Sequence, residues 1–358
     1  MPFIIMLYIK IMKQKIIILS ACLMSISLTL FSQHVKELKQ IESGTEFWEF
    51  YDKTSPLFEA DTNAAILLFE EAFTKTENSF TKASIMNRLG GLYIETKQFD
   101  KYLDKCEDLI NLGISVFFEI RGNIYPGYTK ALETNERFIS LLERNNELVT
   151  KVKENSSVEY FVQKPEHYDK NKAYPLMMIF HGGIGNIQDN QHFWESDKLK
   201  EEYLVVYVQG RNYLSFLKRR FGTDGTKDVK KVYEQIKNDY LIDTTKILLG
   251  GPSAGGMLSI DLAINNHIPA QGLVLAFPVK PREFGADEIY EAGINGLKVS
   301  MICGENDWAL ERQKEMSVIF DKLDVENRIV IYPENGHEYP DDFSDQILKS
   351  IEFIENKK

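Results

Sequence analysis

One serine of this chain lies in a pattern that could make it a nucleophile. Gly251-Pro252-Ser253-Ala254-Gly255 follows the apolar run 246–250 and precedes the helix-like run 257–264. The order strand, G-x-S-x-G, helix is that of a nucleophile elbow, in which glycines permit a sharp turn. Such a turn would expose the Ser253 hydroxyl and direct the backbone N–H of Ala254 at a carbonyl oxygen. The pattern alone is weak evidence, because about 0.1 matches arise by chance in a chain of this length.

A base for this serine should lie downstream, because a serine hydroxyl needs a histidine to take its proton. His337 directly follows the expected strand 328–332. The other downstream histidine, His267, follows the helix of the elbow and so falls on the wrong side of the sheet. We therefore predict that His337 is the base, with an ordinary loop histidine as the alternative.

A carboxylate is also needed, to orient the histidine. Asp307 directly follows the expected strand 299–303, in a loop at the carboxyl edge of the sheet. Its alternatives are a solvated loop aspartate or the cap of the next helix. Among its rivals, Glu305 is too close to the strand end to reach across, and Asp324 lies at the far end of a helix. We predict that Asp307 is the acid.

Two backbone N–H groups should stabilise the negative charge that develops on the substrate oxygen. Ala254 should supply one, and the turn His181-Gly182-Gly183 after the expected strand 176–180 should supply the other, from Gly183. His181 precedes the serine in the chain, so we interpret it as a residue that fixes this turn. A tight turn without catalytic meaning is the alternative.

The first part of the chain has the pattern of a helical domain. No convincing strand alternation is evident from Val35 to Val152. The stretch 89–102 resembles one tetratricopeptide repeat, in which Gly90 would let two helices approach closely, although Tyr102 stands where such repeats have a small residue. One unit is fewer than the roughly three that a solenoid needs, so a helical cap on the second domain is an equal alternative. Apolar residues recur at helical spacing in 64–73, 85–94, 99–112 and 131–148.

The second part alternates strands with helices, after the polar boundary stretch 153–157. This alternation implies a mostly parallel sheet covered on both faces, with ligands bound beyond the carboxyl ends of its strands. We predict a small all-α domain, residues 33–153, followed by an α/β domain, residues 154–358. The expected strands are 158–162, 176–180, 204–208, 247–249, 273–277, 299–303 and 328–332, and the expected helices are 228–240, 257–264, 310–323 and 343–354.

Four segments resemble the α/β-hydrolase superfamily: 174–183, 205–210, 239–247 and 336–340. They are similar to those of secreted esterases related to feruloyl esterases and polyhydroxybutyrate depolymerases. The resemblance covers residues 158–358. It implies a serine hydrolase without cofactor or metal ion, in which Ser253, Asp307 and His337 form the triad.

The chain departs from this group at two places. Pro252 stands where the group has a larger side chain with a free N–H, and we assign it no role. The loop 211–221 lacks the aromatic and cysteine pattern of secreted depolymerases, which leaves the substrate open.

Several side chains could decide which ester is cleaved. Phe193, Trp194, Trp308 and Tyr339 could each line an acyl or aromatic pocket, or could equally serve in packing. Lys218-Arg219-Arg220 could hold an anionic group of a substrate, although a solvated face is the commoner meaning of such a charge run.

The N-terminus has the pattern of a targeting segment. Three lysines, the last at position 15, precede the apolar run 16–31, and Ser32 offers a small residue at a cleavage point. We predict a signal peptide over residues 1–32 and an exported protein, periplasmic or secreted. An uncleaved anchor and a lipoprotein modified at Cys22 are the alternatives.

Beyond residue 32, the 358-residue chain is acidic. It carries 39 basic and 53 acidic side chains, a net charge of −14, which repels phosphate backbones and argues against nucleic-acid binding. Cys106 and Cys303 lie outside any C-x-x-C pattern, so metal binding has no support, and we expect buried free thiols rather than a disulfide.

These features predict an exported serine esterase that acts on a small-molecule or polymer-linked ester through an acyl-enzyme intermediate. Alternatives on the same fold are a serine peptidase and an acyltransferase. An alternative from another class is an inert hydrolase-fold protein whose helical domain binds a protein partner. No feature of the sequence indicates the oligomeric state.

Overall fold

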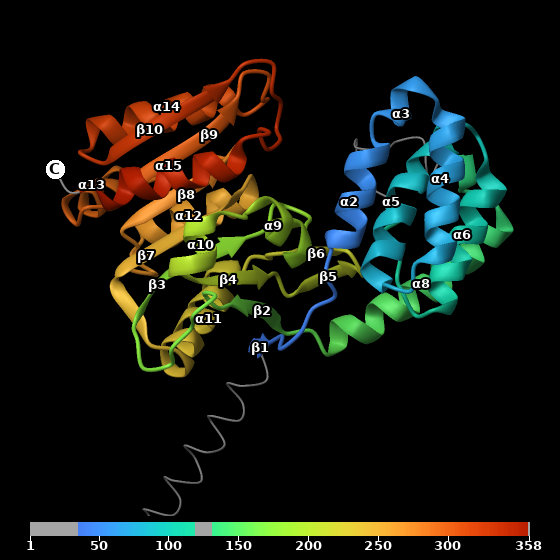
Figure 1. The fold of residues 1–358 in the computed structure, drawn as a ribbon, viewed down its shortest axis with the longest axis horizontal. Coiled ribbons are helices and arrows are strands. Elements are labelled where there is room, and N and C mark those ends of the chain that lie inside the picture. The colour runs from blue at the N-terminus through green and yellow to red at the C-terminus, as the bar shows by residue number, and fades with distance from the viewer. Residues whose placement is uncertain (1–34, 119–130, 357–358) are drawn as a thin grey trace, which may run out of the picture.

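The computed structural model describes residues 35–118 and 131–356 (Figure 1). The expected signal segment 1–32, with Cys22, lies outside the described residues. None of the helices in the described part of the chain has the length and apolar character that a membrane span requires.

A sheet of eight strands forms the centre of the second part, in the order β1-β2-β4-β3-β7-β8-β9-β10. Strand β2 is antiparallel to β4, and every other neighbouring pair is parallel, which confirms the prediction of a mostly parallel sheet. The strands are β1 (Val35–Glu37), β2 (Val158–Gln163), β3 (Tyr174–Phe180), β4 (Leu204–Gln209), β7 (Ile242–Pro252), β8 (Gly272–Ala276), β9 (Lys298–Gly304) and β10 (Glu326–Tyr332).

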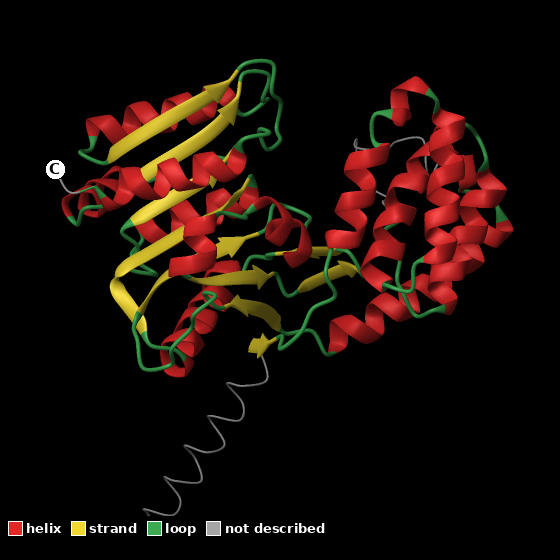
Figure 2. Cartoon of the chain, viewed as in Figure 1, coloured by secondary structure: helices red, strands yellow, loops and turns green. Residues whose placement is uncertain are grey.

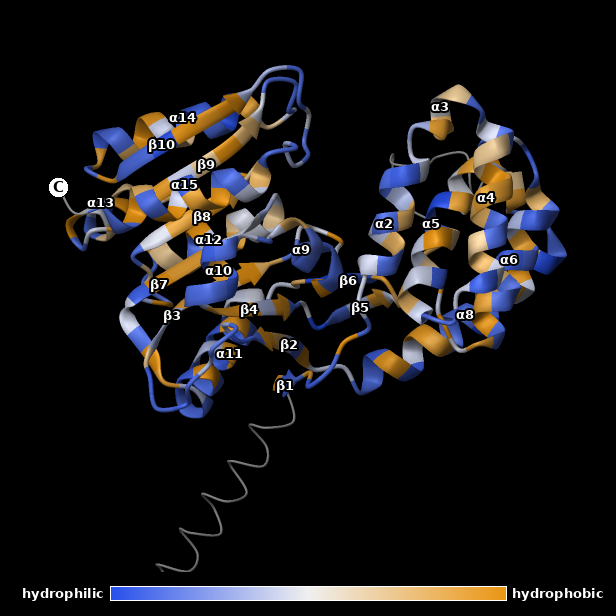
Figure 3. Ribbon diagram, in the orientation of Figure 1, coloured by the Kyte–Doolittle hydropathy of each residue, from blue (hydrophilic) through white to orange (hydrophobic). Residues whose placement is uncertain are grey.

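Helices cover both faces of this sheet (Figure 2). Every residue of β4 and β8 is buried, as expected for strands covered on two sides. One face packs against α11 (Gly225–Asp239), α12 (Ala254–Ile264), α13 (Ala286–Ile294) and α14 (Leu310–Lys322). The other packs against α9 (Ile187–Phe193), α10 (Asp197–Glu202) and α15 (Phe343–Glu355). Figure 3 shows the apolar strands between helices whose outer faces are hydrophilic.

The sheet order, the antiparallel strand β2 and the turn from β7 into α12 together give the α/β-hydrolase fold that the sequence predicts. Cys303 lies in this part and Cys106 in the helical part, and both thiols are buried and free, as expected.

The first described residues correct the prediction of an uninterrupted helical segment. Val35–Glu37 forms strand β1, which pairs in parallel with β2. The backbone N–H of Leu38 donates to the Tyr160 oxygen (2.7 Å), and the Tyr240 hydroxyl donates to the Glu37 carboxylate (2.9 Å). Three residues are too few to show a strand period, so their conformation depends on the edge they join. The chain thus contributes to the sheet before it enters the helical part.

The helical part contains the expected helices, with boundaries that differ at two of them. The helix expected at 85–94 is α5, which begins six residues earlier, at Ser79. The expected helix 131–148 corresponds to α8, which begins only at Glu136, because the Asn135 side chain caps it by accepting the N–H of Phe138 (3.0 Å). A Cβ on Gly90 would lie 3.1 Å from the Tyr102 ring, so the glycine makes room for that ring between two helices. The helices are α2 (Thr45–Thr54), α3 (Leu57–Ala60), α4 (Thr62–Lys75), α5 (Ser79–Glu95), α6 (Phe99–Asn111) and α8 (Glu136–Glu154).

The two parts meet through elements that the sequence pattern did not indicate. A hairpin of β5 (Asn212–Ser215) and β6 (Lys218–Arg220) extends from the sheet region toward the helices (Figure 1). The hydroxyls of Ser115 and Tyr213 are 2.6 Å apart, and Leu217 is buried in the core of the helical part. The Trp48 ring of α2 stacks on His192 of α9, with centroids 4.4 Å apart.

Candidate active site

Ser253 lies on a strained turn between β7 and α12. Its φ of 51° and ψ of −117° are values that residues with a side chain rarely adopt. Backbone bonds on both sides hold this conformation: the Ser253 N–H donates to the Ala276 oxygen (2.9 Å), and the Val279 N–H donates to the Ser253 oxygen (3.2 Å). The sharp turn expected at Gly251–Gly255 is therefore present, and it is held by the end of β8.

The glycines of the elbow permit a close approach to the end of β3. A Cβ on Gly251 or on Gly255 would overlap the carbonyl oxygen of Phe180. Pro252 lies beside the turn that follows β3, because its Cγ would be 3.9 Å from a Cβ placed on Gly182. The elbow thus packs directly against the turn that follows β3.

Ser253, His337 and Asp307 form one hydrogen-bonded chain. His337 Nε2 lies 2.8 Å from Ser253 Oγ, and its Nδ1 lies 2.9 Å from Asp307 Oδ1. Since a carboxylate oxygen can only accept, Nδ1 carries the proton and donates it, and Nε2 accepts from the serine hydroxyl. The Asp307 side chain is fully buried, whereas that of His337 is 23% exposed. This arrangement can deprotonate the serine as it attacks an electrophile.

Asp307 is itself held by two further donors. Its Oδ1 also accepts the backbone N–H of Ala309 (2.8 Å), and its Oδ2 accepts from Gln313 Nε2 (2.9 Å). Gln313 is fully buried, and the same Nε2 donates to the Pro278 oxygen (3.1 Å), near the end of β8. The sequence analysis did not identify Gln313, because a glutamine six residues beyond the acid, inside a helix, matches no catalytic pattern.

The rival side chains do not join this chain of bonds. In the described residues no hydrogen bond connects Glu305, Asp324 or His267 to Ser253 or to His337. Glu305 instead accepts the backbone N–H of Glu334 (3.2 Å) at the surface.

His181 fixes the turn after β3, as its position predicts. The Gly210 N–H donates to His181 Nε2 (3.0 Å), which leaves the proton on Nδ1 to be donated to the Gly182 oxygen (2.7 Å). The ring also stacks on Phe221, with centroids 4.4 Å apart. Burial lowers the pKa of His181 to about 4, so the ring is neutral near pH 7.

The two expected oxyanion donors lie next to each other. A Cβ on Gly183 would be 3.9 Å from the Cβ of Ala254. Ala254 is the first residue of α12, so its N–H has no acceptor within the helix and is available to a bound oxygen.

The aromatic side chains near His337 divide into packing and exposed groups. Tyr339 is stacked on Phe193 (4.3 Å between centroids), and its hydroxyl accepts from Trp194 Nε1 (3.1 Å), so these three serve in packing. Trp308 is 70% exposed and lies 5.0 Å from the His337 ring, measured between centroids. Phe277, which the sequence analysis did not single out, packs edge-on against the His337 ring at 4.7 Å.

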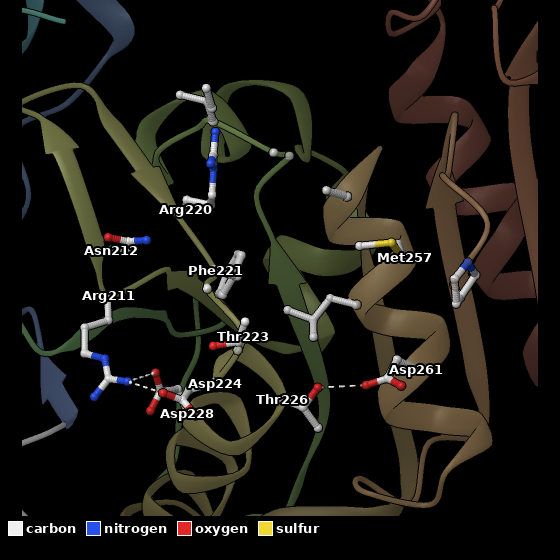
Figure 4. Close-up of a pocket in the computed structure, with 18 of the residues that line it drawn as sticks. Arg211, Asn212, Arg220, Phe221, Thr223, Asp224, Thr226, Asp228, Met257 and Asp261 are labelled. Atoms are coloured by element: carbon white, nitrogen blue, oxygen red, sulfur yellow. Dashed lines mark hydrogen bonds and ion pairs between the residues drawn. The ribbon is translucent and has the colours of Figure 1, made fainter. Parts of the chain in front are cut away.

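A cavity of about 1310 Å³ adjoins the two oxyanion donors (Figure 4). Gly182, Gly183 and Ala254 line it, together with the hairpin β5–β6 and the first turns of α11 and α12. Lys153 and Ser156, from the end of the helical part and the linker, also contribute to its wall. The two expected oxyanion donors therefore border a space large enough for an extended substrate, while Ser253, His337 and Asp307 are not among the residues that line it.

Comparisons with known proteins give partial similarities. No protein-family profile matches the sequence. The chain is 34% identical over 90 residues to a bifunctional acetylxylan esterase/xylanase of Neocallimastix patriciarum, which covers 24% of this chain and 13% of that protein. It is 23% identical over 209 residues to dipeptidyl peptidase 4 of Bos taurus, which covers 51% of this chain and 27% of that protein. The chain thus spans only a small part of the length of these curated relatives.

Solved structures show similarly distant matches. An uncharacterized protein from Bacillus cereus is 19% identical with a TM-score of 0.48, over 87% of this chain and 99% of that one. A carboxylesterase from Bacillus cereus is 17% identical with a TM-score of 0.45, over 57% of this chain and 98% of that one. At this distance, neither match assigns an activity to the chain.

Proposed function

We propose that this protein is a serine hydrolase that cleaves a carboxylic ester. The observation that supports it best is the bonded chain Ser253–His337–Asp307, with distances of 2.8 and 2.9 Å, on a strained turn at the carboxyl edge of the sheet. A serine and a histidine in this geometry are the two parts of an activated nucleophile.

In the first half of the reaction, Ser253 Oγ attacks the carbonyl carbon of the ester while His337 Nε2 takes the hydroxyl proton. The carbonyl oxygen becomes an oxyanion that accepts the N–H groups of Gly183 and Ala254, each worth about 3 kcal/mol in such sites. The tetrahedral species then collapses, the bond to the alcohol breaks, and His337 gives its proton to the departing oxygen.

In the second half, water attacks the acyl-enzyme and returns the system to its starting state. His337 takes a proton from the water, whose oxygen bonds to the acyl carbon, and then returns a proton to Ser253 Oγ as the carboxylic acid leaves. Asp307 stays ionised throughout and stabilises the positive charge on His337 in each half. Its complete burial keeps that interaction away from water.

A peptidase on the same fold is the second candidate, supported by the similarity to dipeptidyl peptidase 4 over 51% of this chain. The two candidates share all the groups above and differ in the leaving group. Parallel assays with 4-nitrophenyl acetate and with a dipeptidyl 4-nitroanilide separate them. We expect turnover of the ester only.

Replacing Ser253 by alanine tests the proposal. The variant should lose about 10⁴-fold or more of the ester turnover, since the nucleophile is gone, and it should not be labelled by a fluorophosphonate probe. Ser344→Ala, at an exposed serine of α15, is the matched control and should retain both properties. Undiminished turnover in a folded Ser253→Ala variant would refute the proposal.

A further inference from the structure

The hairpin β5–β6 presents two polar side chains to the cavity beside the oxyanion donors. Asn212 and Arg220 are directly opposite each other in the antiparallel register, so their side chains lie on the same face. Both are exposed, and both line the cavity that Gly183 and Ala254 also line. The hairpin is therefore placed to contact a substrate whose carbonyl lies at those donors.

The arginines around this hairpin differ in whether their charge is neutralised. Arg211 forms ion pairs with Asp224 (3.3 Å) and Asp228 (3.2 Å). Arg219 points away from water, pairs with Glu159 (3.7 Å) and lies over the Tyr213 ring (3.9 Å). Arg220 forms no ion pair with any acid of residues 35–118 or 131–356. Its charge is thus available to an incoming group.

The acids of the cavity lie away from Arg220. Figure 4 shows Asp224 and Asp228 close to Arg211, and Asp261 apart from them on α12, all on the side away from Arg220. Asp224 and Asp228 are engaged by Arg211, and Asp261 accepts the hydroxyl of Thr226 (2.7 Å). Lys153, Arg282 and Glu283 also line the cavity. Arg220 is therefore separated from the acids drawn in Figure 4, and no acid of the described residues pairs with it.

We infer that the ester cleaved at Ser253 carries a carboxylate, and that Arg220 binds this carboxylate. The inference rests on the proposed function. A guanidinium presents parallel N–H donors that match the two oxygens of a carboxylate, and the Asn212 amide offers a further donor beside it. Phe221 and Met257 line the wall of the same cavity and can contact the apolar part of the substrate (Figure 4).

Paired substrates, one member with a carboxylate and the other with a neutral group in its place, test this inference. The 4-nitrophenyl monoester of glutaric acid carries a carboxylate on the acyl side, and 4-nitrophenyl pentanoate is its neutral partner. 3-Acetoxybenzoate and 3-acetoxybenzamide form the second pair, with the carboxylate on the alcohol side. The protein should prefer the charged member of one pair by about tenfold or more in kcat/KM, because hydrogen bonds to charged groups are strong. The pair that shows the preference identifies the side of the ester that carries the carboxylate.

The variants then assign the preference to one side chain. Arg220→Gln should lower kcat/KM for the charged ester about tenfold and leave the neutral ester within about twofold. For Arg220→Lys, kcat/KM for the charged ester should lie between the values of the unmodified protein and of Arg220→Gln. Lysine keeps the charge but lacks the planar fork of N–H donors. Arg312→Gln removes the same charge from an exposed arginine of α14 that does not line the cavity, and it should behave as the unmodified protein.

Two results overturn the inference and are distinct from a failure of the proposed function. If the protein hydrolyses the neutral esters through Ser253 but shows no preference in either pair, the substrate is not selected by a carboxylate. If the preference exists but Arg220→Gln and Arg312→Gln reduce it equally, it arises from overall charge and not from this site. If no ester is hydrolysed and Ser253 is not labelled, the proposed function is wrong, and the inference fails with it.

Discussion

Acidification should loosen the oxyanion turn, because it protonates a histidine that the folded chain requires in its neutral form. His181 is 1% exposed, and its Nε2 must accept the N–H of Gly210. A protonated ring donates from both nitrogens, so Nε2 can no longer accept the Gly210 N–H and that bond is lost. The buried positive charge then lies near the charges of Arg219 and Lys218, which disfavour it. The turn that carries Gly183 depends on this ring.

The size of the effect follows from the two pKa values. Burial lowers the pKa of His181 to about 4 in the folded chain, against about 6.5 in the unfolded chain. The difference corresponds to about 3 kcal/mol. Below about pH 6.5 the unfolded chain binds the proton and the folded chain does not, so the free energy of unfolding falls as the pH falls toward 4. The stabilisation is complete above the unfolded pKa, and the slope between the two values approaches ~1.4 kcal/mol per pH unit.

Urea unfolding of the unmodified protein and of His181→Gln, from about pH 4.5 to 7.5, measures this contribution. The glutamine can still accept the Gly210 N–H and does not titrate, so its stability should fall less steeply with acid. Other titrating groups affect both proteins equally and cancel in the comparison. His267→Gln, at the end of the elbow helix, is the matched control and should parallel the unmodified protein.

Parallel stability curves for the unmodified protein and His181→Gln across this range would refute the reasoning. They would mean that His181 is protonated as readily in the folded chain as in the unfolded one, in spite of its burial and its two backbone bonds.

Three further substitutions, at two residues, test a contact of the site and a contact between the two parts of the chain. Gln313→Leu removes a donor from Asp307 Oδ2, so kcat/KM should fall about tenfold, with KM little changed and the acid limb of the rate's pH profile displaced. For Gln313→Glu, kcat/KM should be lower still, because the substitution places a second carboxylate beside that of Asp307. Trp48→Ala removes a buried indole that stacks on His192, and it should lower the free energy of unfolding by about 3 kcal/mol in urea titrations followed by circular dichroism.

The sequence predicts that the catalytic candidates lie close together because each of them lies within five residues of the end of a strand. Ser253 follows β7, Asp307 lies three residues beyond β9, and His337 lies five residues beyond β10. In a parallel sheet these strand ends meet at one edge, so residues far apart in the chain are brought together by topology alone. The strands themselves are evident from short apolar runs, which mark burial on both faces.

The elements that the sequence does not predict are those whose conformation depends on distant contacts. β1 is three residues long and is defined by its pairing with β2. The hairpin β5–β6 contains the charge run 218–220, whose pattern indicated a solvated face, yet Arg219 is held between Glu159 and the Tyr213 ring. Neither partner could be inferred from the neighbouring sequence.

The loop that carries His337 shows how these unpredicted elements bear on the chemistry. Tyr339, two residues beyond the base, stacks on Phe193 at the end of α9, and Phe193 in turn packs edge-on against Trp48 of the helical part. The Tyr339 hydroxyl is also held by Trp194. The helical part therefore contacts α9, and α9 contacts the loop of the base. Because the Ser253–His337 bond depends on where that loop lies, the packing around α9 contributes to the geometry of a triad whose members all belong to the other part of the chain.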